Sequence, residues 1–496
     1  MAKVDKAVVT NAAALHAKYG TGFNAGKALK PIVDADTRRG LSTRVIDLSN
    51  ATEMRRLGGE AVAKPGDHRA TKEAIDAIFK SLRPHYLLIV GSRDVVSAQR
   101  LRNPTPDDGD ADVPTDLPYA CEHGFSDRAH DFRAPTRVVG RLPDGMGATE
   151  PTLLATVVRN ASRWRQRPRA DYESYLGVSA RVWTKSTQLS LRNTFGASRD
   201  LKLSPTAGPR WRKEVLSRRS HFFNCHGAPE DPHFYGQRGG DYPIAHDAAY
   251  LEGRIAEGTV ATAECCYGAE LYDPHRAGGQ EGIVSVYLRG GAYGFFGSSN
   301  IAYGPAEGNG QADLICQYFL QRVLAGASVG RAALEARQRF VRETSVLDPA
   351  DLKTLAQFSL IGDPSIQPVR SAAAAAGGSP EAMREARRAN LLALGLALED
   401  SRSYAVARPS PRKASQPAIE RVREQFGLED ARVRSYDVEM PPALARLGNA
   451  AVPAAPAAIH VLTAPLDGGL PARQYRVVVV AERSGELVSV RDLYTR

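Results

Sequence analysis

The sequence lacks the segments that would place a protein in a membrane or carry it across one. No stretch of the 496 residues approaches the ~20 consecutive apolar residues of a membrane-spanning helix. Residues 1–20 show no basic region followed by an apolar region and a cleavage site, so no signal peptide is recognised. Cysteine is scarce, and its count of five is odd, which argues against a disulfide framework. These absences predict a cytoplasmic protein with reduced thiols.

The chain also lacks the motifs of nucleic-acid-binding proteins, although its formal net charge is +10. Lysine and arginine are scattered, and there is no RNA-recognition signature, no zinc-finger spacing and no basic region that leads into heptads. A dispersed excess of arginine is typical of a solvated surface. We therefore expect no membrane partner and consider a nucleic-acid partner unlikely.

What is present is the composition of a globular protein, with 43% hydrophobic and 24% charged residues. Strand-like and helix-like patterns alternate through the first 370 residues. We expect strands at residues 7–9, 43–48, 85–91, 175–182, 221–224, 259–263 and 283–287. Helices are expected at residues 12–19, 26–35, 69–82, 246–257, 311–324 and 328–342, the last with Ser328 as its N-cap. This alternation predicts an α/β fold with a mostly parallel sheet.

Composition also indicates how the chain is divided. An alanine run followed by glycine and proline at residues 371–380 marks a boundary, and a helix at 380–398 and an exposed polar stretch at 401–416 follow it. A helix at 419–426 and a hairpin at 475–493 suggest a small appended domain. We predict an N-terminal α/β subdomain, a catalytic subdomain, a linker with a helix and a C-terminal α+β domain, at residues 1–168, 169–370, 371–416 and 417–496.

Two apparent ligand sites fail on their spacing. Residues 20–27 are rich in glycine, but the first glycine of a phosphate loop would fall at Thr21 and its hydroxyl residue at Ala28. A Cys-His pair at 225–226 and a Cys-Cys pair at 265–266 gather possible zinc ligands. Adjacent residues on a strand point to opposite faces, so each pair offers only one ligand easily. We therefore expect neither a metal nor a cofactor.

The same two pairs place a histidine and a cysteine at the ends of two strands. His226 follows the strand at 221–224 and precedes Gly227, and Cys266 follows the strand at 259–263 and precedes a Tyr-Gly turn. A cysteine nucleophile needs a nearby base, and glycine lets backbone N–H groups approach a carbonyl oxygen. We predict that Cys266 and His226 form a catalytic pair; the alternative is a core cysteine and a hydrogen-bonded core histidine.

These motifs resemble those of caspase-like (clan CD) cysteine peptidases, most closely the gingipain-like branch. The resemblance rests on the order of Asn224-Cys-His-Gly227, Ala263-Glu-Cys-Cys-Tyr-Gly268 and segments 86–91, 113–119, 138–143 and 358–365. It covers about residues 5–370 and implies a caspase-like sheet flanked by helices. Some relatives have cysteine-any-any-glycine at the nucleophile, which makes Cys265 the alternative nucleophile. The tail after residue 371 matches no family that we can name.

The resemblance implies a cysteine endopeptidase that acts on proteins or peptides. Cys266 would attack the scissile carbonyl, His226 would transfer the proton, and the backbone N–H groups of Gly227 and Cys266 would hold the oxyanion. Relatives of this kind imply a role in regulated proteolysis, including stress and antiphage (antiviral) responses. The alternative, from a different class, is a catalytically inactive scaffold of the same fold that binds protein or nucleic acid.

Two further expectations concern specificity and control. Glu264 lies two residues before Cys266 on the same strand face, so its carboxylate is expected to line the pocket for an arginine or lysine side chain. Asp116 and, more weakly, Asp127 are further candidates. Exposed basic residues are candidate sites of activating cleavage, either by the enzyme itself or by an upstream activating protease: Arg276, Arg402, Arg408, Arg412 and Lys413.

Overall fold

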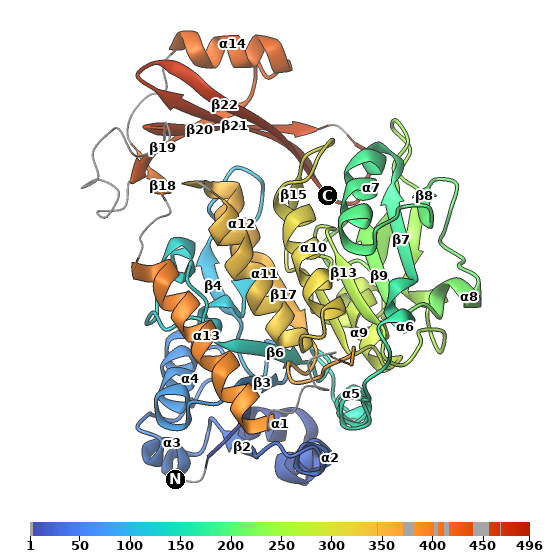
Figure 1. Cartoon of the computed structure of the whole chain (residues 1–496), viewed down its shortest axis with the longest axis vertical. Coiled ribbons are helices and arrows are strands. Elements are labelled where there is room, and N and C mark those ends of the chain that lie inside the picture. The colour runs from blue at the N-terminus through green and yellow to red at the C-terminus, as the bar shows by residue number, and fades with distance from the viewer. Residues whose placement is uncertain are drawn as a thin grey trace.

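The computed structural model describes residues 3–344, 346–370, 380–400, 405–410, 416–439, 456–466 and 468–496. Its centre is a ten-stranded sheet (Figure 1). From one edge to the other, the strands are β2 (Thr43–Asp47), β1 (Lys6–Thr10), β3 (Tyr86–Val90), β6 (Val138–Leu142), β17 (Phe358–Ile361), β14 (Gly294–Ser298), β13 (Val260–Ala263), β9 (Ser220–Asn224), β7 (Tyr175–Ala180) and β8 (Leu201–Ser204). The predicted α/β fold with a large, mostly parallel sheet is confirmed.

This sheet consists of two parallel halves that run in opposite directions. β2, β1, β3, β6 and β17 are parallel to one another, and so are β14, β13, β9, β7 and β8. The halves meet where β14 and β17 pair in antiparallel fashion, with Phe295 opposite Ile361. The two predicted α/β subdomains therefore share one sheet, and their division at residue 168 stays a prediction.

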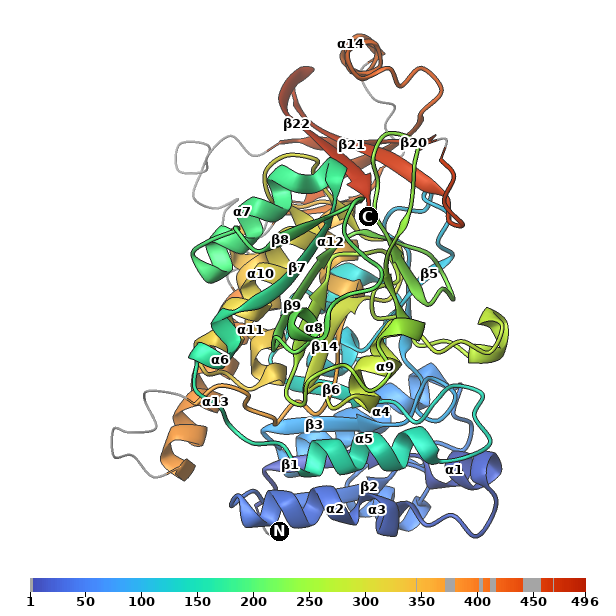
Figure 2. The ribbon, with the colours of Figure 1, turned by 90° about the vertical axis from the view of Figure 1, so that its right-hand side faces the viewer.

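Helices flank the sheet. The main ones are α1 (Ala12–Tyr19), α2 (Ala25–Arg38), α3 (Ala51–Arg56), α4 (His68–Leu82), α5 (Thr152–Ser162), α7 (Thr184–Phe195), α9 (Ile283–Arg289), α10 (Gln311–Leu324), α11 (Val329–Glu343), α12 (Pro349–Gln357) and α13 (Pro380–Asp400). Figure 2 shows α10 and α11 on one side of the half formed by β14, β13, β9, β7 and β8, and α9 on the other. Ser328 caps α11 as predicted, because its hydroxyl accepts a hydrogen bond from the N–H of Arg331. None of the described helices is long and apolar enough to span a membrane.

A second sheet of seven strands lies across one end of the molecule (Figure 1). Its strands are, in order, β15 (Tyr303–Gly304), β22 (Glu486–Thr495), β21 (Gln474–Arg483), β20 (Ala458–Leu466), β19 (Arg432–Glu439), β18 (Ala405–Pro409) and β16 (Val346–Leu347). The predicted hairpin is confirmed as β21 and β22, and the predicted helix as α14 (Gln416–Phe426). Because β15 and β16 come from the first 370 residues, the C-terminal segment is joined to that part of the chain edge to edge.

Three expectations from the sequence were wrong. Residues 283–287 form helix α9 rather than a strand, since a short apolar run with all sides buried does not distinguish the two. Residues 246–257 do not form one helix: β12 (Ile244–Asp247) is followed by a single 3-10 turn, and Gly253 has a φ of +64°. Within the predicted linker, residues 405–409 form β18, which pairs with both β16 and β19.

Candidate active site

β9 and β13 lie side by side in the half of the sheet that runs from β14 to β8, with Phe223 opposite Ala263. Both strands therefore end at the same edge, where the chain continues into the two predicted catalytic segments. A Cβ atom added to Gly227 would lie 1.8 Å from the main-chain oxygen of Cys266, so this approach requires glycine. The fold thus brings the main chains around His226 and Cys266 into contact.

The thiol of Cys266 is buried against the segment that leads into β15. The N–H of Ala302 donates to Sγ at 3.2 Å, and Sγ lies 3.6 Å from the carbonyl oxygen of Ala302, to which it donates. Burial raises the pKa of the thiol to about 12, although the hydrogen bond with Ala302 acts in the opposite direction. Cys266 is therefore a neutral thiol at neutral pH in this structure.

His226 is enclosed by polar and aromatic side chains. Nδ1 accepts a hydrogen bond from the side-chain amide of Gln474 at 2.6 Å, and Nε2 donates to the amide oxygen of Gln237 at 2.7 Å. The ring of Trp183 lies 4.3 Å away between centroids. Burial lowers the pKa of His226 to about 3. The imidazole is therefore neutral, and its hydrogen-bond partners differ from those of the Cys266 thiol.

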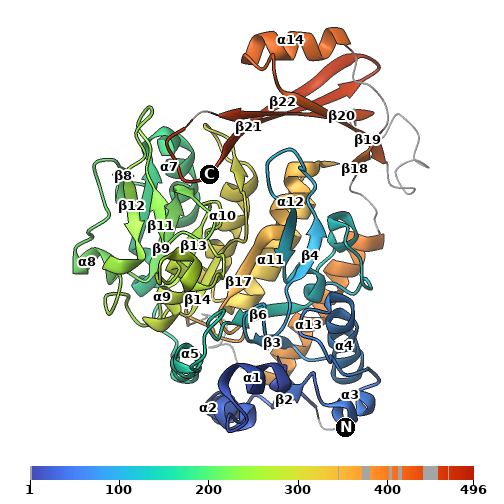
Figure 3. The same cartoon turned by 180° about the vertical axis from the view of Figure 1, so that it is seen from behind.

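The last residue of the chain lies between these two groups. The main-chain oxygen of Arg496 accepts hydrogen bonds from the N–H of Cys266 at 3.2 Å and from the N–H of Gly227 at 3.5 Å. These are the two donors that the sequence predicted for an oxyanion. In Figure 1 the C-terminus accordingly lies between β15 and α7, and Figure 3 shows it beside α7 from behind.

The guanidinium of Arg496 fills a buried site that we call the arginine pocket, formed by Trp183, Ser186, Gly304, Pro305 and Asp313. Nη2 donates to the two carboxylate oxygens of Asp313 at 3.1 and 3.2 Å and to the carbonyl oxygen of Pro305 at 2.9 Å. The guanidinium carbon lies 4.4 Å from the ring centroid of Trp183. A charged group this deeply buried needs such partners, and the pocket supplies both a counter-charge and a stacking surface.

Gly304 makes room for that side chain. A Cβ atom at this position would lie 2.1 Å from Nη2 of Arg496, so any larger residue would close the pocket. Asp313 lies in the first turn of α10, where its carboxylate also accepts from the N–H of Gly310 at 3.3 Å. A second donor to the carboxylate is the hydroxyl of Ser186.

Glu264, the predicted specificity residue, is completely buried next to this pocket. Burial, followed by the negative charge of Asp313, raises its pKa well above the usual range, and the positive charge of Arg496 opposes that rise. The structure therefore places Glu264 beside the arginine pocket, while Asp313 makes the direct contacts.

The other candidate nucleophile, Cys265, is directed into the core. Its thiol is fully buried beside Cys225, and burial followed by the contact with Cys225 raises its pKa well above the usual range. Its carbonyl oxygen accepts from the hydroxyl of Ser298 at 2.7 Å, which fixes the main chain before Cys266. In the described part of the chain, no group of three or more His, Cys, Asp or Glu residues is arranged to hold a metal ion.

The remaining pocket candidates lie elsewhere, which corrects the prediction for Asp116. Its two carboxylate oxygens accept from Nε and Nη2 of Arg141 at 2.8 and 2.6 Å, and both residues are buried. Asp116 therefore neutralises a buried arginine of β6 and is not available to a substrate. Asp127 pairs with Arg102 at 3.0 Å on the surface.

The candidate cleavage sites differ in their surroundings. Arg276 is exposed in a 3-10 turn and pairs with Glu230 at 2.7 Å. Arg408 corrects the prediction of an open linker, because it lies in strand β18 and pairs with Glu439. Arg402, Arg412 and Lys413 lie outside the described residues.

Several residues that form the site were not found by sequence reasoning. Asp313 lies in the first turn of a helix, where acidic residues are common because they interact favourably with the helix dipole. Its position in the sequence therefore gives no sign of a role in binding. Gln474 begins β21 and Arg496 follows β22, and both lie more than 200 residues away in the sequence from His226 and Cys266. The antiparallel pairing of β22 with β15, opposite Tyr303 and Gly304, helps to bring this part of the chain to the site.

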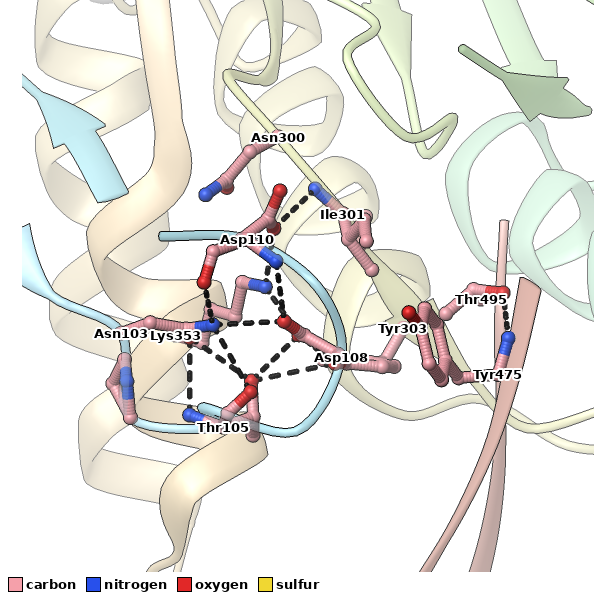
Figure 4. A network of polar contacts seen from close by, with 12 residues as sticks. Asn103, Thr105, Asp108, Asp110, Asn300, Ile301, Tyr303, Lys353, Tyr475 and Thr495 are labelled. Atoms are coloured by element: carbon pink, nitrogen blue, oxygen red, sulfur yellow. Dashed lines mark hydrogen bonds and ion pairs between the residues drawn. The ribbon is translucent and has the colours of Figure 1, made fainter. Parts of the chain in front are cut away.

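A buried ionic cluster holds β15 in place, and we call it the fixed cluster: Asp108, Asp110 and Lys353 (Figure 4). Nζ of Lys353 lies 2.5 Å from Asp108 and 2.6 Å from Asp110. Asp108 also accepts from the hydroxyl of Tyr303 in β15, and Asp110 accepts from the N–H of Ile301 at 3.0 Å. The segment that contacts the Cys266 thiol and pairs with β22 is therefore fixed to helix α12.

A model of the family described as "Peptidase family C25" matches residues 246–369 of this chain. The matched segment includes Glu264, Cys266 and Asp313. No curated protein matches the chain.

Among solved structures, one described as "Structure of Protease" is 14% identical and covers 99% of this chain and 97% of its own, with a TM-score of 0.48. The Saccharomyces cerevisiae separase–securin complex is 11% identical, and the match covers 60% of this chain and 17% of that one, with a TM-score of 0.33.

Proposed function

We propose that this chain is a caspase-like cysteine peptidase with Cys266 as its nucleophile and His226 as its general acid–base, a proposal that the match of residues 246–369 to peptidase family C25 supports. The two residues follow adjacent parallel strands, and Gly227 lets their main chains approach. Protein or peptide substrates follow from the class. The register on β13 supports Cys266 over Cys265, because the thiol of Cys265 is directed toward Cys225 in the core.

The observation that carries the specificity is the position of Arg496. Its main-chain oxygen accepts from the two proposed oxyanion donors while its guanidinium contacts Asp313. This is the arrangement required of the residue that precedes a scissile bond. We therefore propose cleavage after arginine, with lysine as a weaker substrate, because an ammonium group lacks the planar surface that stacks on Trp183.

The reaction follows from these positions. His226 takes the thiol proton, and the sulfur of Cys266 attacks the carbonyl carbon while the N–H groups of Gly227 and Cys266 stabilise the oxyanion. The C–N bond then breaks, the imidazolium returns its proton to the leaving amine, and a thioester remains. A water molecule, deprotonated by the same imidazole, attacks the thioester and releases the carboxylate and the thiol.

Labelling and mutation together test this function. We expect an arginyl acyloxymethyl ketone to modify Cys266, with the adduct located by mass spectrometry, and we expect His226→Ala to prevent the modification. Fluorogenic peptides with arginine before the scissile bond should be cleaved faster than those with lysine, and aspartate should not be accepted. Cys265→Ala is the matched control for Cys266→Ala and should keep a substantial share of the activity. A folded Cys266→Ala variant that still hydrolyses the peptide would exclude this nucleophile.

The physiological role is inferred only from the resemblance to gingipain-like peptidases. We propose that the peptidase acts in a cytoplasmic pathway of regulated proteolysis, such as a stress or antiphage response, and that cleavage at Arg276 modulates it. The exposure of Arg276 in a surface turn supports this site. Intact-mass spectra of the wild type and of Cys266→Ala test for self-cleavage there, with Arg276→Ala as the control. A chain that resists added trypsin at Arg276 would exclude the site.

A further inference from the structure

The C-terminal part of this chain occupies its own candidate active site. We infer that strands β21 and β22 and the terminal Arg496 act as an intramolecular, substrate-like inhibitor that must leave before another peptide can bind. The inference rests on the proposed function, since it names what regulates that same site. Three independent contacts carry it: a strand pairing, a side chain in the pocket and a cap on the histidine.

The strand pairing has the geometry of a bound peptide. β22 runs antiparallel to β15, with Thr495 opposite Tyr303 and Tyr494 opposite Gly304. The N–H of Arg496 extends the pairing and donates to the carbonyl oxygen of Ala302 at 3.0 Å. Peptides commonly bind by adding a strand to an exposed edge in this way. Figure 4 shows Thr495 beside Tyr303.

The pocket and the oxyanion donors are occupied at the same time. Arg496 has an exposed fraction of 1%, its guanidinium is bound to Asp313, and its main-chain oxygen is bound to Cys266 and Gly227. A second peptide with arginine at the same position would need the same carboxylate and the same two N–H groups. Arg496 and such a substrate therefore exclude each other.

Gln474 adds a contact that a substrate would not make. Its amide donates to Nδ1 of His226 at 2.6 Å, and its amide oxygen accepts from the hydroxyl of Tyr242 at 3.0 Å. The lone pair of Nδ1 is thus engaged, and Nε2 carries the proton that it donates to Gln237. An imidazole in this state has no free nitrogen to accept the thiol proton of Cys266. The C-terminal sheet therefore blocks the base as well as the pocket.

Contacts outside the site also hold the sheet. They include the pairing of β18 with β16, the packing of Tyr436, Val477 and Leu493 into the main core, and ion pairs such as Arg434 with Asp107. A partner that releases the sheet must therefore replace these contacts as well as those of Arg496. A tethered segment competes well, because its effective concentration is roughly millimolar. Peptides that bind weakly would be excluded, and a partner that displaces the sheet would activate the enzyme.

Binding tests the inference without any need for turnover. In a Cys266→Ala background, the anisotropy of a fluorescein-labelled peptide that ends in arginine is measured with Arg496→Ala, and with Arg421→Ala as the matched control from exposed helix α14. We expect affinity to rise roughly tenfold or more with Arg496→Ala, because hydrogen bonds to a charged group are lost from the competitor, and to stay unchanged with Arg421→Ala. Equal affinity in all three chains would overturn the inference.

Activity gives the second measurement. Arg496→Ala and Gln474→Ala should each raise kcat/KM for an arginyl peptide, and Gln425→Ala, an exposed glutamine of α14, should not. If peptide binding rises but no variant cleaves, the inhibitor is confirmed and the proposed function fails. If the wild type cleaves as fast as both variants, the proposed function stands and the inhibitor is excluded. Gln474→Ala leaves Arg496 in place. Its kcat/KM therefore tests for inhibition by the C-terminal segment even if Arg496→Ala loosens the sheet.

Discussion

Two buried sites in this molecule have the same composition, two carboxylates and one cation, but differ in where the cation comes from. In the fixed cluster, Lys353 of α12 serves Asp108 and Asp110. In the second, which we call the pocket cluster, Arg496 serves Asp313, with Glu264 beside it. One cation belongs to a helix in the middle of the chain, and the other to the end of a strand.

The two clusters therefore differ in function, although their chemistry is similar. A cation held on a helix between two sheets cannot leave without unfolding, so the fixed cluster can only position other groups. Burial lowers the pKa of Lys353, but the charges of Asp108 and Asp110 outweigh that effect and raise it, so the lysine stays charged. A cation at the end of a strand can be exchanged for one that arrives on another chain. The pocket cluster is therefore a binding site that its own chain fills.

Lys353→Met gives the largest expected effect. It leaves two carboxylates buried without a cation, and breaking such a pair costs about 3–5 kcal/mol of the free energy of unfolding. Chemical denaturation with urea measures this loss. Lys30→Met is the matched control, because Lys30 pairs with Asp34 on the surface and is 67% exposed, where about 0–1 kcal/mol is expected.

The distinction between the two clusters would be wrong if Arg496→Met lowered the free energy of unfolding as much as Lys353→Met. Arg496 is as buried as Lys353, but its site opens when the strand leaves, and water can then reach Asp313. We expect the catalytic sheet of Arg496→Met to unfold at nearly the same urea concentration as that of the wild type.

Asp313→Asn should have the next largest effect, and it should act on binding rather than on folding. Removal of the charge weakens the hydrogen bonds to the guanidinium, each of which contributes about 1.5–3 kcal/mol when a charged group takes part. In the Cys266→Ala, Arg496→Ala background we expect the affinity for an arginyl peptide to fall about a hundredfold, as measured by anisotropy. Asp116→Asn, a buried carboxylate outside the pocket, should leave the affinity unchanged; an equal loss there would indicate a general effect on folding.

The pocket cluster, unlike the fixed cluster, should couple ligand binding to pH. Burial and the charge of Asp313 raise the pKa of Glu264, and an arginine in the pocket lowers it. The bound state therefore holds fewer protons than the open state, so affinity must increase as pH rises through the range in which Glu264 ionises. We expect this increase in affinity when anisotropy is measured across a series of pH values in the same background. Glu264→Gln should abolish the slope, and an affinity that falls as pH rises would contradict the assignment.

The sequence predicted a catalytic pair but neither of the two clusters. Strand patterns located β9 and β13, and strand alternation continued past Ala263 predicted that Glu264 and Cys266 share one face. Those signals are local, because each depends on a few adjacent residues. Asp116, by contrast, was a wrong candidate, since nothing near it in the sequence shows that Arg141 lies opposite.

The pocket cluster depends on contacts that no local pattern records. Asp313 lies 127 residues from Ser186 and 183 from Arg496, and only the packed fold brings the three together. The crossover after β9 was missed for a related reason: Gly253 ends the helical pattern, and a small sheet forms instead. Periodicity identifies which face of an element is buried, but not the element against which that face packs.

The smallest effects are expected from removal of two hydroxyl groups, one at each cluster. Together they test most directly whether the two clusters differ. The hydroxyl of Tyr267 donates to Asp110 of the fixed cluster at 2.8 Å, and that of Ser186 donates to Asp313 of the pocket cluster. Each substitution, Tyr267→Phe and Ser186→Ala, removes one hydrogen bond to a charged acceptor and should cost about 1–2 kcal/mol. The two clusters differ in where that cost is expressed.

Tyr267→Phe should lower the free energy of unfolding and leave the peptide affinity of the Cys266→Ala, Arg496→Ala chain unchanged, because Asp110 keeps Lys353. Ser186→Ala should weaken peptide affinity several-fold and hardly alter unfolding, because Asp313 in the open state can be hydrated in place of the lost donor. Anisotropy measures the peptide affinity of both variants, and urea denaturation measures their free energies of unfolding. If each substitution changed both quantities equally, the clusters would be energetically alike, and the division between a fixed and an exchangeable cation would be wrong.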